Sequence, residues 1–243
     1  MLFPQTLLER LAVASLRKLD REVASDAAVA QRFADELLVG VPISRKGFLV
    51  DVGCASGRNV LLLRSLGYNV VGVDLQCYGD IWAQEADRFF CANAYALPFA
   101  DKSADYVLAH AVLEHCRYDD QVIAEIRRIL KDDAIAFVMV PQHTLYNRLW
   151  KRCKDRDHYR EYTAEGLASL MERGGFEMVT VRRRFVYAPI CMFCLNQLFG
   201  ITAGLLGGAR GHFRLLEWID KFVPENERGL IYAVCQKKNL GAG

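Results

Sequence analysis

The sequence lacks a dominant charge, an internal repeat and a low-complexity tract. Its 31 Lys and Arg residues and 29 Asp and Glu residues give a formal net charge of +2, so the charge balance neither favours nor excludes a polyanionic partner. The eight cysteines have no spacing typical of a disulfide framework, and Cys191-x-x-Cys194 has neither a second pair nor a nearby His. These cysteines indicate a reduced, cytoplasmic protein.

The first residues lack the uninterrupted apolar core of a secretory signal. Charged residues such as Glu9, Arg10 and Arg17 divide the stretch from Met1 to Leu19, and its apolar residues follow the pattern of an amphipathic helix. We therefore expect one domain over residues 1–243, which begins with a helical extension over residues 1–42.

Apolar segments with strand patterns alternate along the chain with segments that have helix patterns. This alternation predicts a doubly wound α/β fold, in which helices cover both faces of a mainly parallel sheet. The expected strands are 48–52, 69–74, 88–91, 105–109, 134–140, 176–183 and 230–236, and the expected helices between them are 57–66, 79–86, 119–130 and 163–173.

The most informative stretch is the first strand and the turn that follows it. Gly53 and Gly57 bracket a tight turn, and Asp51 lies near the carboxyl end of the strand. The second apolar strand ends in another acid, Asp74. A glycine turn makes room for a nucleoside, and the acid accepts hydrogen bonds from its ribose hydroxyls. A third glycine is missing, so a nucleoside without pyrophosphate fits better than a dinucleotide.

These motifs resemble those of the class I S-adenosylmethionine (SAM) methyltransferases, and most closely those of the ubiquinone and menaquinone biosynthesis branch. The resemblance covers roughly residues 45–183. It implies a seven-stranded sheet with strand order 3-2-1-4-5-7-6 and an antiparallel seventh strand, SAM as cofactor and S-adenosylhomocysteine as product. The motifs are Asp51-Val-Gly53-Cys-Ala55-Ser-Gly57, Asp74, Asn93-Ala-Tyr-Ala-Leu97-Pro98-Phe99, Ser103-Ala-Asp105-Tyr-Val107 and Val112-Leu-Glu-His115.

The resemblance also implies the contacts to SAM. Asp74 would bind the ribose diol, with a helix N-cap as its alternative role. Asn93 replaces the acid that is usual in the family; its side chain would accept from the adenine amino group or donate to a ring nitrogen, or it would only form a turn. Asp51 would reach the methionine amino group through a water molecule, and Leu75 and Ala94 would lie against the adenine ring. The methionine end of SAM would be lined by the backbone of the turn residues Gly53, Cys54, Ala55 and Gly57 and by the backbone carbonyl of His110.

Two histidines are candidates for a general base. His143 follows the fifth expected strand, and His158 precedes a Thr-x-x-x-Leu helix. Imidazole near neutral pH can take a proton from an acceptor, although either ring could serve only to hold a loop. His115 is a candidate for orienting its loop. The sequence suggests no metal-ligand cluster, so no metal is expected.

The segment from residue 185 to residue 209 contains no charged residue. It lies in an insertion of about 184–228, where the family usually has a short hairpin. Long insertions in compact domains are often lids or binding elements, so a substrate lid or a homodimer interface is expected ahead of peripheral contact with a membrane.

The function expected from these features is methyl transfer from SAM to a small or lipid-like acceptor by in-line SN2 displacement. A non-catalytic SAM-binding subunit of the same fold and an RNA methyltransferase are the alternatives. The segment from His110 to Glu114 lacks the Asn/Asp-Pro-Pro-Tyr motif of base amino methylation, so nucleic acid is disfavoured as a partner.

Overall fold

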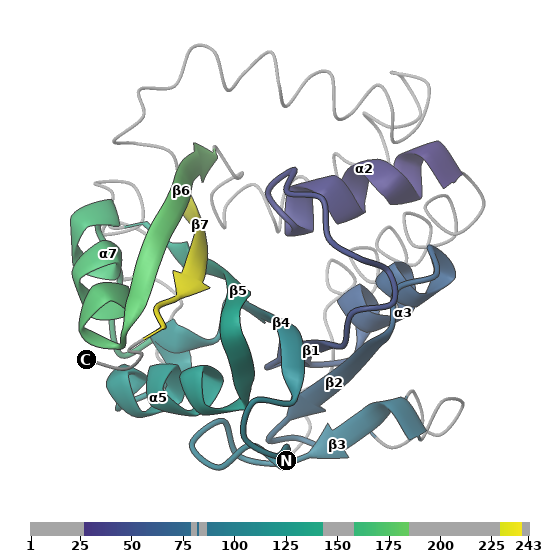
Figure 1. The fold of residues 1–243 in the computed structure, drawn as a ribbon, viewed down its shortest axis with the longest axis horizontal. Helices are drawn as coiled ribbons and strands as arrows, with labels where there is room; N and C mark the ends of the chain where they lie inside the picture. Colours follow the sequence, from purple (N-terminus) through teal and green to yellow (C-terminus); the bar gives the residue numbers. More distant parts are fainter. Residues whose placement is uncertain (1–26, 79–81, 83–86, 143–157, 185–228, 240–243) are drawn as a thin grey trace, which may run out of the picture.

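In the computed structural model, seven strands form one twisted sheet with helices on both faces (Figure 1). The structure describes residues 27–78, 82, 87–142, 158–184 and 229–239. The strand order is β3-β2-β1-β4-β5-β7-β6, as expected. The strands are β1 (Leu49–Val52), β2 (Val70–Asp74), β3 (Phe89–Cys91), β4 (Ala104–His110), β5 (Leu130–Pro141), β6 (Phe176–Arg184) and β7 (Leu230–Lys237).

The strand directions place the carboxyl ends of five strands at one edge of the sheet. β1 pairs in parallel with both β2 and β4, β2 with β3, and β4 with β5. β7 is antiparallel to β5 and to β6, as the family resemblance implied. Consequently the last residue of β6 and the first residue of β7 also lie at this carboxyl edge.

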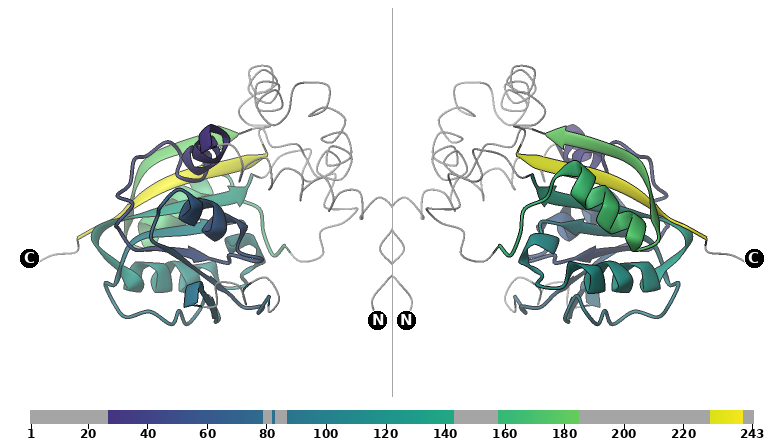
Figure 2. Two further views of the ribbon diagram at one scale, coloured as in Figure 1. Left: turned by 90° about the vertical axis from the view of Figure 1, so that its right-hand side faces the viewer. Right: turned by 90° about the vertical axis from the view of Figure 1, so that its left-hand side faces the viewer.

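Helices cover the two faces of the sheet because neighbouring strand residues point to opposite sides. Val50 and Val52 pack in a core that also contains residues of α5 and α7, whereas Leu49 packs in a second core with residues of α2 and α3. The left view of Figure 2 looks onto α2 and α3, and the right view looks onto α7 and α5. The helical elements are α2 (Ala27–Leu37), α3 (Arg58–Ser65), the 3-10 helix η2 (Leu113–His115), α5 (Asp119–Ile129) and α7 (Ala164–Arg173).

Most element boundaries agree with the sequence prediction to within one or two residues. The exception is β5, which begins at Leu130 rather than at residue 134. Leu130 pairs with Ala104, and the pairing shifts register before Tyr106 meets Ile135. A charged stretch that suggests a turn is therefore part of the strand. Thr163 caps α7, because its side chain accepts a hydrogen bond from the backbone of Gly166.

Several predictions concern residues outside the described part. These are the first part of the N-terminal extension, most of the helix expected at 79–86, His143, and the insertion after Arg184. Among the described residues, no helix is long and apolar enough to cross a membrane.

One cysteine pair differs from the expectation of reduced thiols. Cys77, in the loop after β2, forms a disulfide with Cys91 at the end of β3. No sequence motif signals this pair, because its two members approach only through the parallel pairing of β2 with β3, in which Asp74 lies opposite Cys91.

Candidate active site

The glycine turn after β1 and the acid at the end of β2 are joined directly. Asp74 accepts hydrogen bonds from the backbone N–H of Ala55 at 2.8 Å and from that of Gln76 at 2.9 Å. The turn itself is held by Gly53, whose N–H donates to the carbonyl of Val73 at 2.7 Å. The structure thus brings together the turn and the acid that the sequence had paired, and gives Asp74 the additional role of shaping the turn.

The two glycines of the turn stand where no side chain fits. Gly53 has a φ of +72°, and a Cβ atom there would lie 1.8 Å from Cγ2 of Val112. Gly57 has a φ of +86°, and its Cβ would lie 2.4 Å from the ring of Phe89. Both the left-handed backbone and the close packing therefore require glycine. Ala55 also has a positive φ, of 46°.

Asp51 is a buried carboxylate with an incomplete set of partners. Only 1% of the residue is exposed, and its Oδ2 atom has no hydrogen-bond partner in the part of the chain that the structure describes. Burial raises the pKa of Asp51 to about 8, the side chain of Asn59 lowers it by hydrogen bonding, and the charge of Asp74 raises it further. An ammonium group would compensate such a carboxylate, so the site fits the methionine amino group of SAM.

Asn59, on the first turn of α3, was missed by the sequence analysis. Its hydrogen bond to Asp51 depends on the angle at which α3 leaves the turn, and no motif signalled it. Cys54 points away from the turn into the core, since a Cβ on Gly72 would lie 2.6 Å from its sulfur. Burial raises the pKa of the Cys54 thiol, so only its backbone is offered to a ligand.

The residues expected around adenine lie in the loops after β2 and β3. Asn93 accepts a hydrogen bond from the backbone N–H of Tyr95 at 3.0 Å through its side-chain oxygen. This is the turn-forming role that the sequence left open. The hydrogen bond uses the side-chain oxygen of Asn93 and does not involve its amide nitrogen. Leu75 is 71% exposed, which is unusual for a large apolar side chain. This exposure agrees with a residue that a bound adenine ring would cover. Ala94, next to Asn93, is half-buried.

The ring of His110 points into the core at the end of β4. It hydrogen-bonds to the backbone of Leu37 in α2, and burial lowers its pKa to about 3. It also contacts the ring of Tyr232 edge-on, with centroids 5.8 Å apart. The imidazole is therefore a neutral structural group, which leaves its backbone for the expected contact with SAM.

Beyond β4, three polar side chains from two distant segments meet. The rings of His115 and His158 lie edge to face with centroids 4.5 Å apart, and the carboxylate of Glu114 belongs to the same group. Glu114 is 2% exposed and burial raises its pKa to about 7. In the sequence each histidine stands separately and Glu114 has no assigned role, because only the folded chain brings residue 158 to residue 114.

A second set of contacts fixes the segment that carries His158. The N–H of Tyr159 donates to the carbonyl of Glu114 at 2.8 Å. Arg160 forms an ion pair with Asp119, and the hydroxyl of Tyr162 donates to the same carboxylate at 2.8 Å. Burial and this hydrogen bond raise the pKa of Tyr162. The position of His158 is therefore set by the contacts of the residues that follow it, Tyr159, Arg160 and Tyr162.

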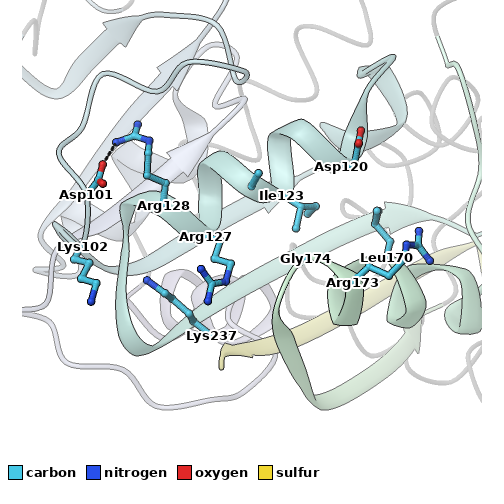
Figure 3. A pocket seen from close by; sticks show the side chains of 11 residues that line it. Asp101, Lys102, Asp120, Ile123, Arg127, Arg128, Leu170, Arg173, Gly174 and Lys237 are labelled. Carbon is cyan, nitrogen blue, oxygen red and sulfur yellow. Dashed lines mark hydrogen bonds and ion pairs between the residues drawn. The ribbon is translucent and has the colours of Figure 1, made fainter. Parts of the chain in front are cut away.

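A cavity of about 650 Å³ lies at the opposite end of the sheet (Figure 3). Its wall includes Lys102 before β4, the end of α5, and Lys237 at the end of β7. Arg128 in this wall is bonded to Asp101 at 2.7 Å and to Glu125 at 2.8 Å. The cavity is thus separate from the carboxyl edge. The guanidinium group of Arg128 already forms ion pairs with carboxylates of the protein itself.

Known proteins resemble this chain in sequence and structure. A family model described as a methyltransferase domain matches residues 50–138. A malonyl-[acyl-carrier protein] O-methyltransferase from Enterobacter lignolyticus is 26% identical over 182 residues, which cover 71% of this chain and 71% of that protein. A probable S-adenosylmethionine-dependent methyltransferase from Mycolicibacterium smegmatis is 25% identical over 136 residues, which cover 54% of this chain and 52% of that protein.

A solved structure shares the fold. It is the 1,6-didemethyltoxoflavin-N1-methyltransferase of Burkholderia thailandensis, with 1,6-didemethyltoxoflavin and S-adenosylhomocysteine bound. The TM-score is 0.54 at 18% identity, and the match covers 98% of this chain and 94% of that chain. Together with the glycine turn and its two acids, these comparisons support an enzyme of the SAM-dependent methyltransferase class. The enzyme uses SAM as its cofactor.

Proposed function

We propose that the enzyme transfers the methyl group of SAM to a small or lipid-like acceptor by in-line displacement. The observation that carries this proposal is the position of the two strand ends that bound the insertion containing the charge-free segment. Arg184, which ends β6, pairs with Leu230, which begins β7, and Leu230 also pairs with Pro141 at the end of β5. The segment from 185 to 209 therefore starts from the edge of the sheet that carries the glycine turn.

An uncharged segment that follows a strand end at this edge suits an apolar acceptor, because binding pockets match the polarity of their ligands. Exclusion of water would also strengthen the electrostatic interactions in the site. The name of the Enterobacter relative describes O-methylation of a malonyl group carried on an acyl-carrier protein, which is a small acceptor group. The similarity of residues 93–99 to the quinone-biosynthesis branch points to a lipid-like acceptor.

The contacts to SAM follow from the geometry of the turn. Asp51 would hold the methionine ammonium, and Asp74 would use its remaining lone pairs for the ribose hydroxyls. Because the oxygen of Asn93 is bonded to Tyr95, its amide nitrogen would donate to a ring nitrogen of adenine. The backbones of Gly53, Cys54, Ala55, Gly57 and His110 would line the methionine, with Leu75 and Ala94 at the adenine.

The chemistry needs little covalent help, since alignment and water exclusion account for much of such a barrier. The acceptor lone pair forms a bond to the methyl carbon, the carbon–sulfur bond breaks, and SAM becomes S-adenosylhomocysteine. An acceptor that carries a proton must also lose it. His158, fixed beside Glu114 at the same edge, is the described candidate for acceptor activation, and His143 is the other.

The test is a search for the acceptor in extracts of a deletion strain. The purified enzyme and SAM with an isotopically labelled methyl group are incubated with the apolar fraction, the water-soluble fraction and the RNA separately. Label in an apolar compound, which grows by the mass of one CH2 group, is the expected result. Label only in RNA or only in polar metabolites would contradict the proposal, as would no transfer to any fraction.

A second experiment addresses the segment itself. Replacement of residues 187–208 by a short Gly-Ser hairpin is expected to preserve SAM binding and to abolish transfer to the apolar acceptor. Full turnover by this variant would rule out a role at the acceptor. Sedimentation of the intact protein with anionic vesicles would indicate membrane contact instead, and loss of a dimer in the variant would indicate an interface.

A further inference from the structure

The side chains of Glu114, His115 and His158 form a ligand set that suits a metal ion. One ligand atom from each residue can be chosen such that all three lie within 4.8 Å of one another. Two imidazoles and one carboxylate bind catalytic zinc and non-haem iron in other proteins, and these sites keep further coordination positions open. Magnesium and calcium prefer sets of oxygen ligands, so the chemistry favours a divalent transition metal.

Glu114 supplies an independent observation that points to a cation. The residue is 2% exposed, and its Oε2 atom is buried with no hydrogen-bond partner among the described residues. A buried carboxylate oxygen without a partner is costly unless a compensating charge lies beside it. A divalent ion shared with the two histidines would provide that charge.

The ligand set is held in place by contacts that do not involve the ligand atoms. The hydrogen bond from Tyr159 to the carbonyl of Glu114, at 2.8 Å, joins the two segments next to the ligands. One residue further on, Arg160 donates to the carbonyl of Arg117 at 2.5 Å. Ligands arranged before the ion arrives lose less conformational freedom on binding.

The set also lies next to the cofactor site. Val112, two residues before Glu114, packs against the glycine turn so closely that a Cβ on Gly53 would collide with it. Val112 directly precedes η2, which carries Glu114 and His115, so a short stretch of backbone connects the turn assigned to the methionine of SAM with the ligand set.

We propose that Glu114, His115 and His158 bind one divalent transition-metal ion, such as zinc, and that an open coordination position receives the acceptor. This inference rests on the proposed function and narrows it to acceptors with an oxygen or sulfur nucleophile. The bound ion would favour release of the acceptor proton to water. The oxygen or sulfur lone pair then forms the bond to the methyl carbon as the carbon–sulfur bond of SAM breaks.

The test measures metal binding directly. The full chain is freed of metal with a chelator and titrated with zinc in a calorimeter, and cobalt is added separately to record its visible absorption spectrum. The variants are Glu114→Gln, His115→Ala and His158→Ala. Glu165→Gln is the control, because this carboxylate lies on the first turn of α7 with a largely exposed side chain.

One zinc per chain is expected in the native protein and in the control. Each ligand variant should weaken zinc binding by at least about 100-fold, since even outer partners of a metal site contribute 10–100-fold, and should change the cobalt spectrum. SAM affinity, measured on the same samples, verifies that each variant is folded. An absence of zinc binding by the native chain would overturn the inference, and so would equal binding by all the variants.

Turnover separates this inference from the proposed function. Once an apolar acceptor is known, removal of the metal should lower the rate and zinc should restore it. Equal rates with and without metal would leave the proposed function intact and overturn the role of the ion. Failure of the acceptor search together with specific zinc binding would instead contradict the proposed function alone.

Discussion

The Oδ2 atom of Asp74 accepts a hydrogen bond from the backbone N–H of Ala55 at 2.8 Å. This bond ties the end of β2 to the turn after β1, so one carboxylate both shapes the glycine turn and faces the cofactor edge. Ala55 has a φ of 46°, a conformation that is strained for alanine and that the bond helps to maintain.

Asp74→Ala should weaken SAM binding by about 1.5–3 kcal/mol, the range for hydrogen bonds to a charged group. Asp74→Asn keeps one oxygen that can accept from Ala55 or from the ribose, so its loss should be smaller. Calorimetric titration with SAM measures both. Unchanged affinity in Asp74→Ala would remove the ribose assignment.

The affinity for SAM should rise as the pH increases toward about 8. Burial raises the pKa of Asp51 to about 8 in the SAM-free protein, so the carboxyl is largely protonated at lower pH. Binding of the methionine ammonium favours the ionised form and displaces that proton. Titrations at several pH values on the native protein and on Asp51→Asn test this, and the slope should be absent in the variant. The same slope in both proteins would contradict the assignment.

The stability of the SAM-free protein should also depend on Asp51. The pKa is raised from 3.8 to about 8 on folding, so over this interval the folded state holds a proton that the unfolded state has lost. The contribution of this group to the free energy of unfolding is therefore fully present below pH 3.8 and decreases as the pH rises through about 8. Denaturant titrations should show that Asp51→Asn reduces this decrease. An identical pH dependence would indicate that Asp51 is ionised without SAM.

Gly53→Ala should destabilise the protein and abolish SAM binding. Gly67→Ala is a matched control, because Gly67 has a similar φ of +84° but its Cβ would lie 4.0 Å from the nearest atom, in the side chain of Arg45. The control should lose about 1–2 kcal/mol from the left-handed backbone alone, whereas Gly53→Ala adds the collision with Val112. Denaturant titration and SAM calorimetry compare them, and equal losses would show that the packing of the turn contributes nothing.

If the imidazole of His158 is the general base instead of a metal ligand, His158→Ala should reduce turnover by about 10²–10⁴-fold, while SAM affinity is retained. His143→Ala and the double variant are assayed beside it, because both histidines were candidates in the sequence. Single-turnover kinetics with the identified acceptor give the rate of the chemical step. Full turnover by all three variants would show that neither histidine acts as a base, and that the enzyme accelerates the reaction only by positioning SAM and the acceptor.

The fold was predictable because its signals are local. Val50 and Val52 alternate with Leu49 and Asp51 in a short buried strand that ends before Gly53. The same order of strand, turn and helix recurs along the chain. The strand order came from the family resemblance rather than from the pattern. The start of β5 was misplaced because the charged residues after Leu130 look like a turn, although their backbone continues the sheet.

By itself, the sequence determined the alternation of strands and helices, the need for glycine at residues 53 and 57, and the two acids at the ends of β1 and β2. Only the tertiary structure decided that Asn59 contacts Asp51, that Cys77 meets Cys91, and that His158 lies beside Glu114 and His115. Local propensities act over a few residues, whereas these contacts join segments far apart in the chain. Their distances depend on sheet pairing and loop packing, which no short motif encodes.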